Sequence, residues 1–374
     1  MVHKPLTVMQ LLPAMDAGGV ERGTLELARH LVRHGHRAIV ISDGGRMLPT
    51  LLDAGAEHLY WDIGAKSPWT LRWIPRLREK LREYQPDILH LRSRLPGWVG
   101  YLAWRRMPLD QRPHLITTVH GMYTVGRYSS VMVRGERVIA VSEATRDYIQ
   151  NHYPTVPSDR IRVIYRGVEP MDYPYGYRPD DNWQRDWFLA YPSTRDKYLI
   201  TLPARITRLK GHGDFIEVIG ELRNRGLPVH GLIVGAAHPR KHRLLGEIQD
   251  KIADAKLTHD ISLTGHRGDL REIMALSNVV LSLSREPESF GRTTIEALTL
   301  GVPVAGFSHG GVGEQLREVF PQGQVAVGDV SAIVEKIEGW YRKPPVVPAK
   351  HPFRLQSMLE QTVQLYEEVI SSRA

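Results

Sequence analysis

The chain contains no cysteine among its 374 residues, so disulfide bonds and thiolate metal sites are excluded and a cytoplasmic location is favoured. No run of apolar residues reaches the roughly 18 needed to span a bilayer. The first residues carry no small-residue cleavage site after their short apolar stretch, unlike a signal peptide. Together these absences predict a soluble or peripheral protein.

Acidic residues are scarce in the first part of the chain. Residues 1–140 contain 20 Lys and Arg against 12 Asp and Glu, a balance of +8, whereas the remainder has 49 − 20 = 29 basic and 41 − 12 = 29 acidic residues. Five of the eight tryptophans also lie in this part. Among them are the basic residues Arg72, Arg76, Arg78, Lys80, Arg82, Arg92, Arg94, Arg105 and Arg106.

Basic and aromatic residues together suit an anionic membrane surface or an acceptor that bears phosphates. A solvated helix face above packed tryptophans explains the same composition equally well. No recognised nucleic-acid-binding module accompanies the charge, so no nucleic-acid partner is expected.

The length suits two domains rather than one. Apolar runs bounded by turn residues alternate with amphipathic helical patterns, which predicts βα units and parallel sheets, an α/β fold. The expected strands are Thr7–Leu12, Arg37–Ile41, Ile88–Leu91, Leu115–Val119, Val138–Val141 and Ile161–Tyr165, then Tyr198–Leu202, His230–Val234, Ile261–Leu263, Val279–Leu283 and Val302–Ala305.

The domain boundaries follow from this pattern. We expect a basic N-terminal domain at residues 1–170, a C-terminal domain at 171–348 and a last helix within 349–374, from about His351 to Ile370. Residues 169–197 show no clear period and are expected to form a linker and a loop.

Residues 288–304, which read Glu-Ser-Phe-Gly-Arg-Thr-Thr-Ile-Glu-Ala-Leu-Thr-Leu-Gly-Val-Pro-Val, are the most informative stretch. Ser289 is expected to cap a helix, whose first amide N–H groups would favour an anion. Gly291 would let a ligand approach the backbone. The carboxylates of Glu288 and Glu296 would accept hydrogen bonds from sugar hydroxyls. This combination suits a molecule that is both phosphorylated and rich in hydroxyls, such as a nucleotide sugar.

This stretch resembles the two-glutamate motif of the retaining glycosyltransferases of family 4, the glycosyl transferases group 1. The resemblance covers nearly the whole chain and is strongest over residues 198–340. It implies a GT-B fold, in which two Rossmann-like domains face each other across a cleft and the C-terminal helix crosses back to the first domain. It also implies catalysis without a metal or another cofactor. In agreement, the chain contains no Asp-x-Asp pair, the metal-binding device of the other major glycosyltransferase fold.

Two further motifs match phosphate-binding segments of the resembled family. Residues 204–211, Ala-Arg-Ile-Thr-Arg-Leu-Lys-Gly, follow the first strand of the second domain. There the guanidinium of Arg205 would bind a diphosphate in a bidentate manner, and Lys210 would act as a point charge. Gly18 and Gly19 follow the first strand of the chain and would turn backbone amides toward the donor phosphate or the acceptor. Because they are adjacent, they do not form the spaced-glycine dinucleotide fingerprint.

Residues at predicted strand ends complete the expected site, since open α/β sheets bind ligands there. The resemblance places His120 beside the donor sugar and the reacting centre. It places Gly265, His266 and Arg267 against the nucleotide base. Arg166 departs from the family pattern, which more often has asparagine at this position.

The resemblance therefore implies a retaining, metal-independent transfer of a hexose or N-acetylhexosamine from a nucleotide diphosphate sugar, with a UDP-sugar favoured. His120 and Glu288 would be catalytic. Glu288 would also bind the donor together with Ser289, Phe290, Gly291 and Glu296. The expected acceptor is a glycan or glycolipid, such as a lipopolysaccharide core intermediate. The alternatives are a noncatalytic nucleotide-sugar-binding protein of the same fold and a sugar-nucleotide epimerase or phosphorylase of related architecture.

Two histidine pairs stand at helical or near-helical spacing, His30 with His34 and His238 with His242. The first lies in a basic helix end and the second in a Pro-Arg-Lys segment. Both fit solvated positions better than metal ligands, so no metal site is expected.

Overall fold

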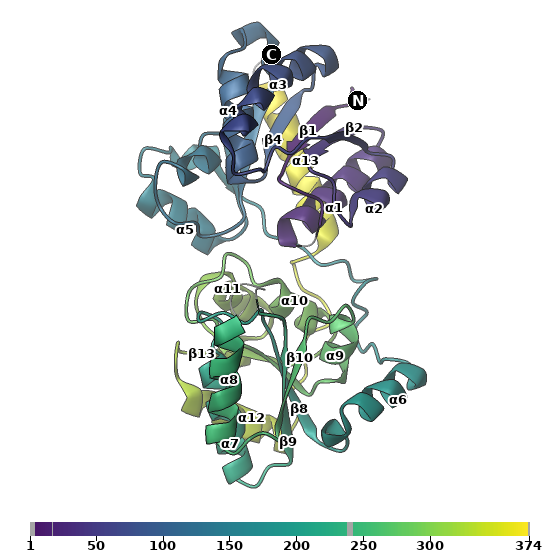
Figure 1. Cartoon of the computed structure of the whole chain (residues 1–374), viewed down its shortest axis with the longest axis vertical. Coiled ribbons are helices and arrows are strands. Elements are labelled where there is room, and N and C mark those ends of the chain that lie inside the picture. Colours follow the sequence, from purple (N-terminus) through teal and green to yellow (C-terminus); the bar gives the residue numbers. More distant parts are fainter. Residues whose placement is uncertain (1–3, 17, 238–241, 373–374) are drawn as a thin grey trace. The chain divides into compact units, whose positions relative to one another are not determined.

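The computed structural model describes residues 4–16, 18–237 and 242–372. Contacts within the chain define two compact units (Figure 1). The N-terminal unit comprises Met1–Tyr165 and Gln356–Ala374, and the C-terminal unit comprises Arg166–Leu355. None of the described helices is long and apolar enough to cross a membrane.

The N-terminal unit is built on a 7-stranded parallel sheet in the order β3-β2-β1-β4-β5-β6-β7. Its strands are β1 (Thr7–Leu11), β2 (Arg37–Ser42), β3 (Glu57–Tyr60), β4 (Ile88–Leu91), β5 (His114–Val119), β6 (Arg137–Ala140) and β7 (Ile161–Val163). The central strands are buried along their whole length, which explains their uninterrupted apolar sequences. From β1 the chain continues to β2, toward one edge of the sheet, and from β4 it continues to β5, toward the opposite edge. The switch point, where such sheets bind ligands, therefore lies between β1 and β4.

Helices connect these strands. They are α1 (Gly19–Arg33), α2 (Leu48–Asp53), α3 (Trp73–Tyr84), α4 (Arg94–Arg105) and α5 (Glu143–His152), with short 3₁₀ turns at Pro68–Arg72, Leu109–Gln111, Ser129–Val133 and Ser158–Arg160. Leu77 and Leu81 on α3 share a buried cluster with Leu89 and Leu91 on β4. The apolar stripe of α3 thus faces the sheet.

The last helix, α13 (Leu355–Ser371), belongs to the N-terminal unit from Gln356 onward and lies beside β4 (Figure 1). Tyr366 is fully buried, and its hydroxyl lies 2.6 Å from His90 Nδ1 on β4. Nearer the surface, Arg162 forms an ion pair with Glu368 at 2.7 Å. The predicted crossing of the C-terminal helix back to the first domain is therefore confirmed, although the helix begins at Leu355 rather than near His351.

The C-terminal unit contains a 6-stranded parallel sheet in the order β10-β9-β8-β11-β12-β13. Its strands are β8 (Tyr198–Pro203), β9 (Val229–Val234), β10 (Ile261–Gly265), β11 (Val279–Ser282), β12 (Val304–Phe307) and β13 (Gln324–Val325). Its helices are α6 (Asp181–Ala190), α7 (His212–Asn224), α8 (His242–Asp254), α9 (Leu270–Leu276), α10 (Arg292–Thr299), α11 (Gly310–Val319) and α12 (Val330–Arg342), with 3₁₀ turns at Pro192–Thr194 and Pro321–Gly323. Here the switch point lies between β8 and β11.

The prediction that residues 169–197 form only a linker and a loop is wrong, because this segment contains α6. The helix begins after Asp180, whose side chain accepts a hydrogen bond from the Trp183 amide at 2.9 Å. Trp187 is buried in a cluster with Leu232 and Val234 of β9. Within its unit, α6 lies on the side that carries α9 (Figure 1). Among the strands, β3 and β13 were not predicted, and β12 begins at Val304 rather than Val302.

Candidate active site

The loop after β8 places a lysine at the switch point of the C-terminal unit. Gly211 ends the loop with φ 68°, and a Cβ there would lie 2.1 Å from the Leu283 carbonyl oxygen, so only glycine fits. Lys210, the residue before it, forms an ion pair with Glu288 in the segment after β11, with Nζ 2.7 Å from Oε1. Both side chains keep 25% of their surface exposed. This pair bridges β8 and β11, and an arriving ligand can still reach both charges.

The turn that carries Glu288 is held by backbone contacts. The amide of Gly311 donates to the Glu288 carbonyl at 2.8 Å, and the Gln315 side chain donates to the Phe290 carbonyl at 2.6 Å. A Cβ on Gly311 would lie 2.5 Å from Phe290 Cα. The glycines that begin α11 are therefore needed for packing against this turn, and they fix where Glu288 points.

The prediction that Ser289 caps the following helix is wrong. The helix α10 begins at Arg292, and its N-cap is Gly291 with φ 85°. A Cβ on Gly291 would lie 2.5 Å from Val312 Cγ2. The left-handed backbone turns the chain into the helix two residues later than expected, and no side chain caps it. The first amides of α10 thus have no capping side chain at the edge that carries Lys210 and Glu288.

Glu296 lies on α10 with its side chain 7% exposed, and Arg292 Nε donates to its Oε1 at 3.2 Å. The expected contact of Glu296 with a ribose would therefore be made by a carboxylate that is already oriented by an arginine. Arg292 was not predicted as part of the site. Its spacing of four residues from Glu296 is the signal that could have identified it.

The segment after β10 carries the three residues expected at the nucleotide base. Gly265 has φ 70° with open space where a Cβ would be, and His266 is exposed. Arg267 instead turns back on its own loop and makes a two-pronged contact with Asp269, at 2.9 Å from Nε and 2.7 Å from Nη2. The hydrogen bond to Asp269 raises the pKa of Arg267. For Asp269, burial alone would raise the pKa, but the hydrogen bonds from Arg267 and Trp183 outweigh it and lower the value.

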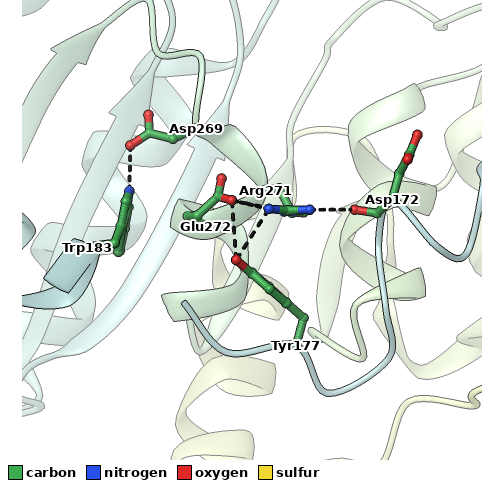
Figure 2. A network of polar contacts seen from close by, with 6 residues as sticks. All are labelled: Asp172, Tyr177, Trp183, Asp269, Arg271 and Glu272. Carbon is green, nitrogen blue, oxygen red and sulfur yellow. Dashed lines mark hydrogen bonds and ion pairs between the residues drawn. The ribbon is translucent and has the colours of Figure 1, made fainter. Parts of the chain in front are cut away.

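Hydrogen bonds hold residues 172–183 against α9 beside this segment, as Figure 2 shows. Trp183 Nε1 donates to Asp269 at 2.9 Å. Arg271 donates to the Asp172 carbonyl at 3.2 Å and to the Tyr177 hydroxyl at 3.3 Å, and it also pairs with Glu272. Its guanidinium lies 4.5 Å from the centre of the Tyr177 ring. Sequence reasoning missed this network because its partners are about 90 residues apart in the chain.

Of the remaining expected residues, Gly18, Gly19 and His120 belong to the N-terminal unit, whereas Arg166 and Arg205 belong to the C-terminal unit. Gly18 has φ 146° and is the N-cap of α1, and Gly19 is the first residue of that helix. His120 follows β5, and its backbone amide donates to the Tyr123 hydroxyl at 3.3 Å. Arg166, the departure from the family pattern, is buried at the start of the C-terminal unit. Arg205 is exposed, and among the described residues its side chain has no hydrogen-bond or ion-pair partner.

The described part of the chain contains no group of three or more His, Cys, Asp or Glu residues that could hold a metal ion. His30 and His34 lie with their ring centres 4.1 Å apart, and His34 Nδ1 is 2.8 Å from the His30 carbonyl. His238 falls outside the described residues.

The site can therefore act chemically through fixed cations and amides. Lys210 and the first amides of α10 lie on segments that follow β8 and β11, so positive charge gathers at the carboxyl edge of the sheet. Such an arrangement stabilises negative charge that develops on a leaving phosphate, and the neighbouring carboxylates can accept hydrogen bonds from hydroxyl groups.

Two family models match the chain. The model described as Glycosyltransferase Family 4 matches residues 17–171, and the model described as Glycosyl transferases group 1 matches residues 184–354. Together they span most of both units.

Curated relatives match over most of their length. The N-acetyl-alpha-D-glucosaminyl L-malate synthase of Bacillus anthracis is 23% identical over 342 residues, 87% of this chain and 84% of that protein. The D-inositol 3-phosphate glycosyltransferase of Mycolicibacterium paratuberculosis is 25% identical over 360 residues, 88% of this chain and 78% of that protein.

Solved structures share the fold over nearly the whole chain. A glycosyltransferase from Rickettsia africae ESF-5 superposes with a TM-score of 0.85 at 28% identity, covering 98% of this chain and 99% of that one. HepE from Anabaena, solved in complex with UDP and glucose, gives a TM-score of 0.80 at 17% identity, covering 97% of this chain and 100% of that one. The two Rossmann-like domains predicted from the sequence are thus confirmed.

Proposed function

The chain belongs to the GT-B glycosyltransferases of the family 4 type, and from this premise we propose that it transfers a hexose or N-acetylhexosamine from a nucleotide diphosphate sugar, a UDP-sugar, with retention of configuration. The observation that carries the proposal is the Lys210–Glu288 pair, which spans the switch point of the C-terminal unit with both side chains accessible. The likeness to HepE, solved with UDP-glucose, supports the choice of donor.

In this proposal Lys210 leaves Glu288 when the donor binds and neutralises the diphosphate. Arg205 and the first amides of α10 assist, so that fixed positive charge takes the place of a metal ion. Glu288, released from the lysine, accepts hydrogen bonds from the donor sugar, and Glu296 does the same for the ribose. Gly265, His266 and Arg267 lie against the base, with Arg267 held by Asp269.

On the N-terminal unit, His120 orients the sugar near the anomeric carbon, and Gly18 and Gly19 present amides to a phosphate. Retention follows from attack on the face that the leaving diphosphate occupies. The anomeric configuration of the product, read by NMR from the coupling constant of the new linkage, tests this step: an inverted product contradicts it.

A thermal-shift series tests the donor assignment. UDP, GDP and ADP, each alone and with its hexose sugars, are compared on the whole chain. We expect UDP and its sugars to raise the melting temperature, because a ligand that binds the folded state stabilises it, and Lys210→Ala to reduce the shift. A response to GDP or ADP instead of UDP rejects the UDP-sugar, and no response to any of them rejects the nucleotide donor.

For the acceptor, we propose a glycan or glycolipid that carries an acidic group, such as a lipopolysaccharide core intermediate. The positive balance of the N-terminal part supports an acidic acceptor. The names of the relatives that act with L-malate or inositol 3-phosphate also favour an acidic acceptor.

We also propose that the N-terminal unit contacts an anionic membrane surface through the turn before α3. Trp69 and Leu71 are 74% and 60% exposed there, and Lys66, Arg72 and Arg76 are exposed around them. Apolar tips ringed by cations suit the headgroup region of an acidic bilayer.

Co-sedimentation with vesicles containing phosphatidylglycerol tests the membrane contact. We expect binding at low salt that weakens in Trp69→Ala and with added salt. Equal binding to neutral vesicles contradicts the electrostatic part of the proposal, and no binding at low salt contradicts all of it.

A further inference from the structure

The switch point of the N-terminal unit contains a buried arginine. Arg92 directly follows β4, and its amide donates to the Leu11 carbonyl at the end of β1 at 3.1 Å. Only 4% of the residue is exposed. From the sequence it was counted with the basic surface of this part of the chain, and that placement is wrong.

Arg92 has a single side-chain partner among the described residues, and that partner is neutral. Nη1 donates to Gln10 Oε1 at 3.1 Å, and the amide of Gln10 is itself oriented by a 3.4 Å contact with the Thr24 carbonyl. Nε is buried without a partner. Nη2 also lacks a partner in the described part of the chain but is not fully enclosed.

Carboxylates lie nearby, but none in the described part of the chain pairs with the guanidinium. Glu21 and Glu26 on α1 act on Arg92 through space, and Glu26 pairs with Arg22 at 3.0 Å. Burial dominates, and it lowers the pKa of Arg92 to about 10. A buried charge without a partner of opposite sign is strongly unfavourable, so its retention at a ligand-binding edge calls for an anion supplied from outside.

The helix that follows adds positive potential. Ser93 is the N-cap of α4, but no side chain caps the helix and its first turn contains no acidic residue. The helix runs over 12 residues, so its first amides and dipole favour a negative group. At α1, by contrast, the Glu21 carboxylate lies against Gly18, with Oε2 2.5 Å from where a Cβ would be.

We propose that Arg92 and the first turn of α4 form an anion subsite that binds the phosphate or carboxylate of the sugar acceptor. The assignment to the acceptor rests on the proposed function, whereas the anion subsite rests on the geometry alone. Gln10 is a positioning residue that holds the guanidinium fork in place.

Thermal unfolding of the whole chain in potassium phosphate, sodium malonate or sodium chloride of equal ionic strength tests the subsite. We expect phosphate or malonate to raise the melting temperature above that in chloride, and Arg92→Met to abolish the increase. In chloride, Arg92→Met should melt at the same or a higher temperature than the wild type, because the substitution removes a buried, uncompensated charge. A purely structural arginine would give a lower melting temperature.

Two variants complete the design. Arg92→Lys keeps a charge but loses the fork, so it should respond weakly to both anions. Arg106→Met, at an exposed position on the same unit, should respond like the wild type. An unchanged response in both Arg92 variants, or no response of the wild type to either anion, overturns the subsite.

Repeating the titration with saturating UDP separates the sources of the anion. If the phosphate response persists beside UDP, the subsite is distinct from the donor site. If UDP abolishes the response in wild-type protein, the anion belongs to the donor and the acceptor assignment is wrong. A failure of every nucleotide to bind contradicts the proposed function but leaves the phosphate and malonate measurements valid.

Discussion

The two units place a cation at the same topological position but treat it differently. In the C-terminal unit, Lys210 at the β8–β11 switch point is paired with Glu288, and its side chain is 25% exposed. In the N-terminal unit, Arg92 at the β1–β4 switch point is buried, and within the described residues its guanidinium hydrogen-bonds only to the side chain of Gln10. A paired, accessible lysine can exchange its carboxylate for a ligand at small cost. A buried arginine without a counter-ion is instead unfavourable until an anion binds to it.

This contrast also separates the chemistry that each unit can perform. An exchangeable ion pair suits a group that arrives, reacts and leaves, such as a nucleotide diphosphate. A rigid, desolvated guanidinium such as that of Arg92 suits the selection of one charged group. It fits a partner that must be correctly oriented.

Substitution of Lys210 gives the largest expected effect. In Lys210→Ala, kcat/KM for the donor should fall by about 10²–10³, or about 3–4 kcal/mol, because a fixed charge that stabilises the leaving group is lost. Steady-state kinetics of transfer, or of donor hydrolysis, measures it. Arg208→Ala is the matched control, since this loop arginine is 76% exposed and its ion pair is with Glu247, outside the Lys210–Glu288 pair. Equal rates for Lys210→Ala and the wild type would remove the lysine from the mechanism.

The turn behind Glu288 tests whether the C-terminal site is rigid. Gly291→Ala places a Cβ 2.5 Å from Val312 Cγ2 in a left-handed backbone, so it should destabilise the protein by about 2–3 kcal/mol. Urea unfolding measures the change. Gly339→Ala, on α12 with open space around it, should be neutral or stabilise by up to about 1 kcal/mol. A neutral Gly291→Ala would mean that the turn can relax.

The buried Arg92 of the N-terminal unit is a cation, whereas the buried His230 of the C-terminal unit is neutral. Acidification can reveal this difference. Burial lowers the pKa of His230 on β9 to about 4, so in the folded state it stays neutral where the unfolded chain takes up a proton. Its contribution to stability is complete above about pH 6.5 and is lost as the pH falls toward 4, amounting to about 2 kcal/mol by pH 5.

His230→Gln should therefore flatten the decline in the free energy of unfolding between pH 7 and pH 5, measured by urea titration at each pH. His259→Gln, at an exposed position, serves as the control and should leave the decline as in the wild type. An unchanged decline in His230→Gln contradicts the assignment.

The smallest effect is expected for the hydrogen bonds that hold residues 172–183 against α9. Trp183→Phe keeps an aromatic ring but removes the hydrogen bond to Asp269, which should cost about 1 kcal/mol of stability and raise KM for the donor with little change in kcat. Trp69→Phe, at a position 74% exposed, should change neither quantity. A fall in kcat at constant KM would argue against a role in donor binding.

The sequence predicted most strands because parallel sheets bury both faces, which leaves uninterrupted apolar runs such as Ile88–Leu91. It did not predict α6, because a helix of 10 residues in a segment rich in Pro, Tyr and Trp is too short to show a clear helical period. The cap at Asp180 and the pair Trp183 and Trp187, four residues apart, were the available signals.

Within the site, motif matching found Lys210 and Glu288 but not that they pair, since 78 residues separate them and only the neighbouring positions of β8 and β11 bring them together. Ser289 was predicted as a helix cap because its residue type favours caps, but the left-handed turn at Gly291 decides where the helix begins. Arg92 was assigned to the surface because composition carries no information about burial.

The return of α13 to the first sheet has a consequence for biosynthesis. His90 and Tyr366 meet inside the N-terminal unit, although every residue of the C-terminal unit up to Leu355 lies between them in the chain. On the ribosome, the N-terminal unit is translated first, but it lacks α13 until the whole C-terminal unit has been translated. We expect the C-terminal unit to complete its folding while the N-terminal unit still lacks one helix, so that an unfinished sheet is exposed during elongation.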